Sequence, residues 1–198
     1  VYTDQVALDA IIDDLTGTPV LLVDTDEIEA KVEMIPWVED ARVRTSFPDA
    51  ASIEIRERTP VAAMMGVDGQ ARVIDADGRV LGLVDGQPVA LVWISGPETL
   101  DVAPGQFASI GYSSAASLVT KLTPEIRSRV DSMLVTPDGS DLVLILTSDR
   151  GPIEVRFGSA LGENAQIEKL VRLQRTLDDV DTKPVTVIDV STSEVTVR

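Results

Sequence analysis

The chain of 198 residues contains no cysteine and no histidine. Without cysteine, no disulfide framework, thiolate nucleophile or cysteine metal site can form, and the redox compartment stays open. Without histidine, the commonest general base and the commonest transition-metal ligand are both missing, and the catalytic triads that use histidine are excluded. The sequence therefore favours a docking module over an enzyme, with no cofactor.

Basic residues are scarce, because 17 Lys and Arg stand against 33 Asp and Glu and give a net charge of -16. This charge repels nucleic-acid phosphates and anionic lipid, so we expect no nucleic-acid partner. The glycine-rich nucleotide-binding motifs are missing as well, since no two glycines stand two positions apart and no Gly-Lys pair occurs. The uncharged run 88–97 has about half the length that a membrane-spanning helix needs.

The chain opens with a pattern typical of two helices. Gly17 is placed to end the first helix, whose single apolar face is formed by Leu8, Ile11, Ile12 and Leu15. Asp24 and Glu27 have the form of a capping box, and Pro36 stops the helical spacing that follows. The second helix is therefore predicted over 25–35.

Two strands are predicted next, at 38–45 and 52–58, joined by a turn that contains Pro48. Both are rich in β-branched residues and alternate apolar with charged positions, as expected of strands with one buried face. Four arginines lie on these strands: Arg42, Arg44, Arg56 and Arg58. We expect them to form cross-strand ion pairs with Glu39, Glu54 and Glu57. A basic face that takes an acidic partner peptide is the less favoured alternative.

From Val61 onward, short β-like runs alternate with turn signals, which predicts a meander of hairpins. The turns are Asp68-Gly69, Asp77-Gly78, Asp85-Gly86 and Asp138-Gly139. Two helices interrupt the meander, at 115–122 and 165–177. The predicted strands are 71–75, 80–84, 90–94, 130–136, 142–147, 153–157, 185–190 and 195–197. The chain is thus α+β, with a boundary near 59–62.

Several residues invite a chemical reading beside a structural one. The run Asp75-Ala76-Asp77-Gly78 faintly resembles the start of a calcium loop, but the later bidentate acid is missing and a hairpin turn is favoured. Two pairs of carboxylates could serve a glycosidase as acid and nucleophile: Asp178 with Asp179, and Asp138 with Asp141. We interpret both pairs as residues of solvated turns instead. Trp37 and Trp93 are expected to pack in the core.

One stretch carries a resemblance to a known family. Its residues are Ile35-Pro36-Trp37-Val38, Ala41-Arg42-Val43-Arg44, Phe47-Pro48-Asp49, Ile53-Glu54-Ile55 and Glu57-Arg58-Thr59-Pro60-Val61-Ala62. This stretch resembles the POTRA domain of the FtsQ family of bacterial division proteins, also called DivIB, in an actinobacterial-like form. The likeness continues through 73–80, 94–97, 168–170, 187–190 and 195–198.

The resemblance implies a POTRA domain at 1–60, with helix, helix, strand and strand, and an FtsQ-type β domain at 61–198. The family's POTRA unit starts with a strand before its first helix, so that strand is expected outside this chain. An edge left unpaired for that reason is not interpreted as a site. The chain starts at Val1 rather than methionine, so we expect it to be an interior piece of a longer protein.

The family's function implies a non-enzymatic scaffold that links early and late division proteins. It implies a single-pass protein of the bacterial inner membrane, anchored by a segment upstream of Val1, with this region extracytoplasmic at the division septum. The implied partners are FtsB and FtsL, two coiled-coil proteins of the divisome, together with other division proteins. The resemblance also implies that a segment of FtsB adds as a new strand to the edge formed by the last β strand of the family's β domain.

Carried onto this chain, the partner site falls on Thr192, Ser193, Glu194, Val195, Thr196, Val197 and Arg198, with Asp189 just before them. Ser191 and Thr192 are small and polar where some members carry basic or aromatic side chains. An unpaired edge strand templates another chain through its free N–H and C=O groups, whatever the family. Two alternatives stay open: a POTRA-containing export component that handles polypeptides, and a cell-wall hydrolase that uses paired carboxylates.

Overall fold

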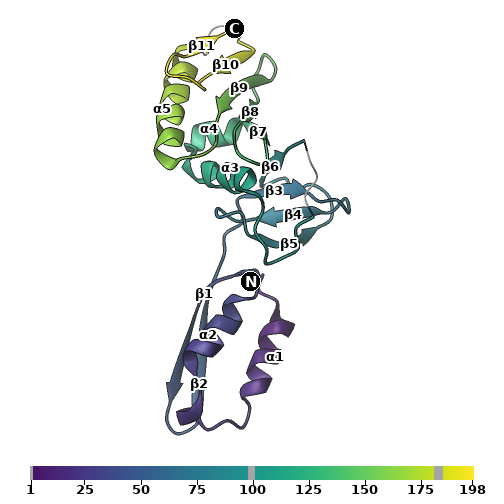
Figure 1. Cartoon of the computed structure of the whole chain (residues 1–198), viewed down its shortest axis with the longest axis vertical. Helices are drawn as coiled ribbons and strands as arrows, with labels where there is room; N and C mark the ends of the chain where they lie inside the picture. The colour runs from purple at the N-terminus through teal and green to yellow at the C-terminus, as the bar shows by residue number, and fades with distance from the viewer. Residues whose placement is uncertain (1, 98–100, 181–184) are drawn as a thin grey trace. The chain divides into compact units, whose positions relative to one another are not determined.

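The computed structural model describes residues 2–97, 101–180 and 185–198 (Figure 1). The chain divides into two units, Val1–Thr59 and Pro60–Arg198, each with its own hydrophobic core. No helix in the described part of the chain has both the length and the apolar character to cross a membrane.

The first unit contains α1 (Gln5–Leu15), a short 3-10 helix (Val20–Leu22) and α2 (Thr25–Glu33). A carboxylate starts each α-helix: Asp4 accepts hydrogen bonds from the backbone N–H groups of Val6 and Ala7, and Asp24 accepts one from Glu27. These are N-caps, which satisfy donors that a helix leaves unpaired at its first turn. The predicted helices are confirmed.

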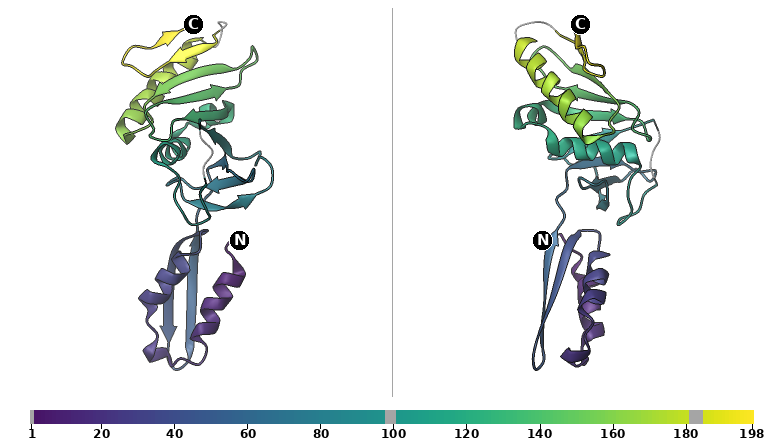
Figure 2. Two further views of the ribbon diagram at one scale, coloured as in Figure 1. Left: turned by 45° about the vertical axis from the view of Figure 1, so that its right-hand side comes forward. Right: turned by 60° about the vertical axis from the view of Figure 1, so that its left-hand side comes forward.

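The same unit closes with β1 (Val38–Ser46) and β2 (Ala50–Glu57), an antiparallel hairpin as predicted. The helices cover one face of this hairpin (Figure 2). The core between them consists of Ile28, Val32, Ile35, Val38, Ala41 and Val43. On the strands, Arg44 pairs with Glu54 at 2.6 Å and Arg56 with Glu39 at 3.4 Å, as expected of cross-strand pairs.

Trp37 is a correction to the sequence-based picture. It is half-buried and lies outside the core cluster, where its ring stacks on Tyr2 with centroids 4.8 Å apart. The neighbouring Val38 takes the inward position on β1 and is fully buried. Trp37 lies in the turn that precedes β1, so the inward position that begins the strand falls to Val38 and not to Trp37.

The second unit is built on one nine-stranded sheet with the order β11-β10-β9-β8-β7-β6-β3-β4-β5. Its strands are β3 (Ala62–Met65), β4 (Ala71–Ile74), β5 (Val80–Val84), β6 (Val92–Ser95), β7 (Val130–Val135), β8 (Leu142–Leu146), β9 (Ile153–Gly158), β10 (Val187–Asp189) and β11 (Thr196–Val197). The helices α3 (Ile110–Lys121), α4 (Pro124–Arg129) and α5 (Glu163–Val180) share one core with a single face of this sheet.

The predicted meander is only partly right. Hairpins form at Asp68-Gly69, Asp77-Gly78 and Asp138-Gly139, but β3–β6, β6–β7 and β9–β10 are parallel pairs. Asp85-Gly86 joins no hairpin, because β6 pairs with β3 and not with β5. Trp93 is also corrected, since it is half-exposed on the face of β6 opposite to Val92 and Ile94.

The calcium-like run is a hairpin turn between β4 and β5, as favoured. Asp75 Oδ1 accepts hydrogen bonds from the backbone N–H groups of Asp77 and Arg79 at 3.0 and 2.8 Å. Gly78 adopts a φ of 81°, a conformation that side chains with a Cβ rarely take. Within the described residues, no group of three or more acidic side chains is arranged to hold a metal ion.

Candidate partner-binding edge

β11 is the outermost strand at one end of the nine-stranded sheet (Figure 1). It pairs antiparallel with β10, which in turn lies parallel to β9. The connection between the parallel strands β9 and β10 contains α5, so it is a helical crossover that leads into the last hairpin. Among the described residues, no strand pairs with the far side of β11.

The ladder between β10 and β11 determines which backbone groups point outward. Arg198 donates its N–H to Val187 O at 2.9 Å, and Val187 donates its own N–H back to Arg198 O at 3.0 Å. Bonded and non-bonded pairs alternate along an antiparallel ladder, and Val197 stands opposite Ile188 in the next, non-bonded pair. The N–H and C=O of Val197 therefore point away from β10, toward the open side.

The seven residues predicted for the partner site fall into two groups. Thr192, Ser193 and Glu194 are exposed and form the turn before β11, not the strand itself. The other four make the edge. Val195 is half-buried and packs against the main core, whereas Thr196, Val197 and Arg198 are exposed.

The turn is braced by its own side chains. Asp189 Oδ1 accepts hydrogen bonds from the hydroxyl of Ser191 at 2.6 Å and from its N–H at 3.0 Å. Thr192 donates its hydroxyl to Glu194 O at 3.0 Å. The Ser191 hydroxyl and N–H hold the pKa of Asp189 below its ordinary value, with smaller help from Arg156 and Arg198. The small polar residues at 191 and 192 therefore stabilise the turn through their hydrogen bonds.

Helix α5 has two cations near the base of this hairpin that sequence reasoning did not assign to the site: Arg172 contacts the hairpin, and Lys169 contacts the end of β9. Arg172 Nη2 donates to Val190 O at 3.3 Å. Lys169 is almost fully buried, donates to Ser159 O at 2.9 Å, and lies 5.1 Å from the centroid of the Phe157 ring. Burial, and then the charge of Arg172, lower the pKa of Lys169. The available signal was Lys169 itself, a cation on the buried side of α5 one turn from Leu173.

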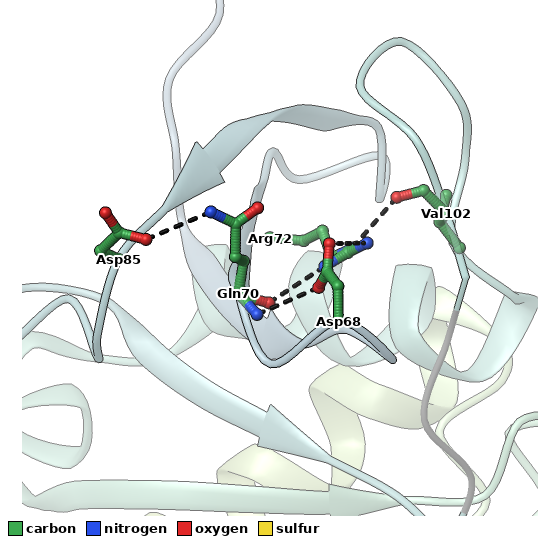
Figure 3. Close-up of polar contacts among 5 residues, drawn as sticks. All are labelled: Asp68, Gln70, Arg72, Asp85 and Val102. Carbon is green, nitrogen blue, oxygen red and sulfur yellow. Dashed lines mark hydrogen bonds and ion pairs between the residues drawn. The ribbon is translucent and has the colours of Figure 1, made fainter.

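The opposite end of the sheet has a different character. Beside β5, Val80 donates to Gln106 O at 2.8 Å and accepts from Gly105 N–H at 2.7 Å, so a loop covers the start of this edge. The same region contains a buried cation, Arg72, which binds the Asp68 carboxylate and donates to Val102 O at 3.1 Å (Figure 3). Arg72 is thus accounted for by local contacts that fasten this loop.

The carboxylates suggested for a hydrolase have local roles. Asp138 accepts hydrogen bonds from Ser140 N–H and its hydroxyl at 3.0 and 2.9 Å, and these contacts lower the pKa of Asp138. A glycosidase acid needs the opposite, a carboxyl whose pKa is raised so that it holds a proton near neutral pH. Asp178 accepts a hydrogen bond from Gln174 on the exposed side of α5. Neither group has the surroundings of a catalytic acid.

Comparison with known proteins gives two consecutive family matches. The family model described as POTRA domain, FtsQ-type, matches residues 1–58. The model described as Cell division protein FtsQ/DivIB, C-terminal, matches residues 63–191. The second match covers more than half of the chain and includes β10, and its last matched residue is the first of the turn that leads into β11.

Three similar relatives bear the name Cell division protein FtsQ. One from Anaeromyxobacter sp. is 32% identical over 175 residues, covering 83% of this chain and 54% of the relative. One from Mycobacterium leprae is 33% identical over 159 residues, covering 79% and 42%. One from Mycolicibacterium smegmatis is 29% identical over 178 residues, covering 90% and 48%. The chain spans about half the length of the curated relatives it matches.

Proposed function

Because the chain belongs to the FtsQ/DivIB family of cell division proteins, we propose that it acts without catalysis, as a scaffold that links early and late proteins of the bacterial divisome. Its proposed partners are FtsB and FtsL, and its docking site is the outer edge of β11 with the turn before it, residues 192–198. We name the segment 195–198 the binding edge.

The observation that carries this proposal is the outward backbone of Val197. An N–H and a C=O on an outer strand template an added strand, which supplies affinity through main-chain bonds. Alternate side chains then supply specificity. On the binding edge, Thr196 and Arg198 lie on one face of the strand, and Val197 lies on the other with the half-buried Val195. A partner segment with an alternating apolar and polar pattern fits both faces.

The proposed place of action follows from the same family. The described residues contain no helix that could cross a membrane, and the family match supports the proposal that they act outside the cytoplasm at the division septum. A membrane-spanning segment upstream of residue 1 is proposed as the anchor. Among the alternatives, an export component is disfavoured by the division-protein match over 63–191.

The test is binding of an FtsB ectodomain to this chain before and after changes at the binding edge. Deletion of residues 192–198 removes the whole site and is expected to abolish measurable binding. The sharper variant is Val197→Pro, because proline removes the outward N–H of this residue and leaves the inward pairs with β10 in place. We expect its dissociation constant to rise at least tenfold, the equivalent of about 1.4 kcal/mol.

The matched control is Val197→Ala, which shortens the same side chain and keeps the N–H. Its dissociation constant is expected to stay within about threefold of the parent value. Undiminished binding by both the deletion and Val197→Pro would refute the site. Equal losses in Val197→Pro and Val197→Ala would mean that the side chain, not the backbone, makes the contact.

A further inference from the structure

The binding edge is short for a strand that has to serve as a template. β11 contains two residues, and within the described ranges its one partner strand is β10, itself a strand of three. A segment that fluctuates must be ordered when a partner binds, and that ordering reduces affinity. The edge is therefore useful only if something outside the ladder holds the hairpin in place.

Arg172 provides one such contact, at the last residue before the turn. Val190 is fully buried, its N–H donates to Arg156 O on β9, and its C=O accepts from Arg172 Nη2. A buried carbonyl needs a donor, and here the donor comes from a helix behind the sheet. Arg172 makes no ion pair with a described residue, and its buried Nε has no hydrogen-bond partner among them. Among the described residues, the hydrogen bond of its guanidinium is therefore with the hairpin backbone.

Lys169 and Gly158 provide the second contact, one helical turn away. Lys169 holds the carbonyl of Ser159, which follows the end of β9. Gly158 has a φ of 67°, and a Cβ built on it would lie 2.8 Å from the Cβ of Ser191. The end of β9 and the start of the turn thus approach closely, at a position where glycine is required by both space and backbone conformation.

We propose that Arg172, Lys169 and Gly158 are positioning residues for the binding edge. They hold the base of the β10–β11 hairpin against β9 and α5, so that the outward backbone of Val197 is presented to a partner in one fixed place. This inference rests on the proposed function only for its effect on partner binding. The anchoring of the hairpin is measurable without a partner.

The experiment compares three variants in the full chain. Arg172→Met removes the donor to Val190, Arg172→Lys retains a donor, and Arg175→Met changes an exposed arginine on the same helix. Hydrogen exchange is followed in peptides that cover 185–198, with peptides of β8 as the internal reference. Affinity for the FtsB ectodomain is measured in parallel, and the deletion of 192–198 reports on the proposed function.

For Arg172→Met we expect exchange in 185–198 to accelerate about tenfold while β8 is unchanged, and affinity to fall on the order of tenfold. Arg172→Lys should restore part of both, and Arg175→Met should alter neither. Unchanged exchange in 185–198 overturns the inference, and so does faster exchange with unchanged affinity when the deletion abolishes binding. If the deletion leaves binding intact, the proposed function fails and exchange alone decides the anchoring.

Gly158→Ala is the second route to the same answer. It introduces the Cβ beside Ser191 without touching α5, and it should give the local exchange pattern of Arg172→Met. If Arg172→Met also accelerates hydrogen exchange in β8, the second unit has unfolded as a whole. The inference then depends on the exchange measured for Gly158→Ala. Unaltered exchange in 185–198 for Gly158→Ala then overturns the inference.

Discussion

Two outer strands, β1 in the first unit and β11 in the second, differ in whether their outward N–H groups have a hydrogen-bond acceptor. On β1, Val43 donates to Glu29 Oε1 at 2.8 Å and Ala41 donates to Glu33 Oε1 at 3.3 Å. On β11, the outward N–H of Val197 has no such cap among the described residues. One edge is closed by carboxylates and the other is left open, so being outermost does not by itself make a strand a docking site.

The geometry of the neighbouring helix explains the closed edge. Glu29 and Glu33 are four residues apart on α2, which places them about 6 Å apart along the helix axis. Two residues of a strand span about 6.8 Å, the spacing between Ala41 and Val43 on β1. The two carboxylates therefore match two successive outward N–H groups.

The chemistry of the helix explains the open edge. Two side chains of α5 at this end of the sheet, Arg172 at Val190 and Lys169 at Ser159, are donors without acceptor atoms. They can hold carbonyl groups from behind the sheet, but they cannot cap an N–H. A helix with acceptors closes one edge, and a helix with donors supports the other while leaving it available.

The largest expected effect comes from opening the closed edge. In the double variant Glu29→Ala with Glu33→Ala, β1 loses two hydrogen bonds to charged acceptors, and we expect the first unit to lose about 2–4 kcal/mol of unfolding free energy. The bared N–H groups should also promote self-association through β1. Chemical denaturation and sedimentation velocity measure the two effects.

Glu27→Ala is the control on the same helix. Glu27 pairs with Lys31 on α2, and both side chains are more than half exposed. An exposed pair of this kind contributes little, so we expect less than about 0.5 kcal/mol and no association. A double variant that behaves like Glu27→Ala would show that the carboxylates do not guard the edge.

An intermediate effect should separate the inward and outward residues of β11. Thr196 stands opposite Asp189 in a bonded pair, so Thr196→Pro removes an inward N–H and should weaken the hairpin by about 1–3 kcal/mol. Val197→Pro removes only an outward N–H and should cost less than about 1 kcal/mol. Hydrogen exchange at Val187 reports the difference. Equal effects of the two prolines would contradict the assigned orientation of the strand.

The smallest effect is a pH dependence of the turn. The pKa of Asp189 is depressed in the folded chain, so its contribution is fully present above the ordinary value of 3.8 and is lost as pH falls through the lower, folded value. The amide resonance of Ser191 should therefore be constant from about pH 7 to about pH 5 and should shift below about pH 4. Asp189→Asn should remove this shift, and Asp179→Asn should not. A shift that survives Asp189→Asn would assign it to another group.

The sequence predicts local elements well where pattern and capping agree. The capping pattern of Asp24 and Glu27 predicts the start of α2, and the alternation of apolar and charged residues predicts β1 and β2. It fails at β3, because Ala62–Met65 lacks β-branched residues and is recognisable only from its neighbours in the sheet. It overlooks α4, although Thr123 and Pro124 form a regular helix start, because six residues give little periodicity.

The candidate site also has a part that the sequence predicts and a part that it does not. The position of the last strand follows from family resemblance and alternation, and the structure adds which of its amides point outward. The contributions of Arg172, Lys169 and Gly158 are not local, since their contacts join residues up to 33 positions apart, as between Gly158 and Ser191. The parallel order of β3, β6 and β7 is equally invisible to a local pattern, which suggested hairpins throughout.

Under the proposed function, the route by which the last hairpin joins the sheet makes partner binding depend on a completed fold. β10 pairs with β9, and the hydrogen bond between Arg172 and Val190 requires α5 to be docked against this end of the sheet. An unfinished or misfolded copy has no surface on which the terminal segment can settle. Under the proposed function, such a copy would offer no binding edge to a partner.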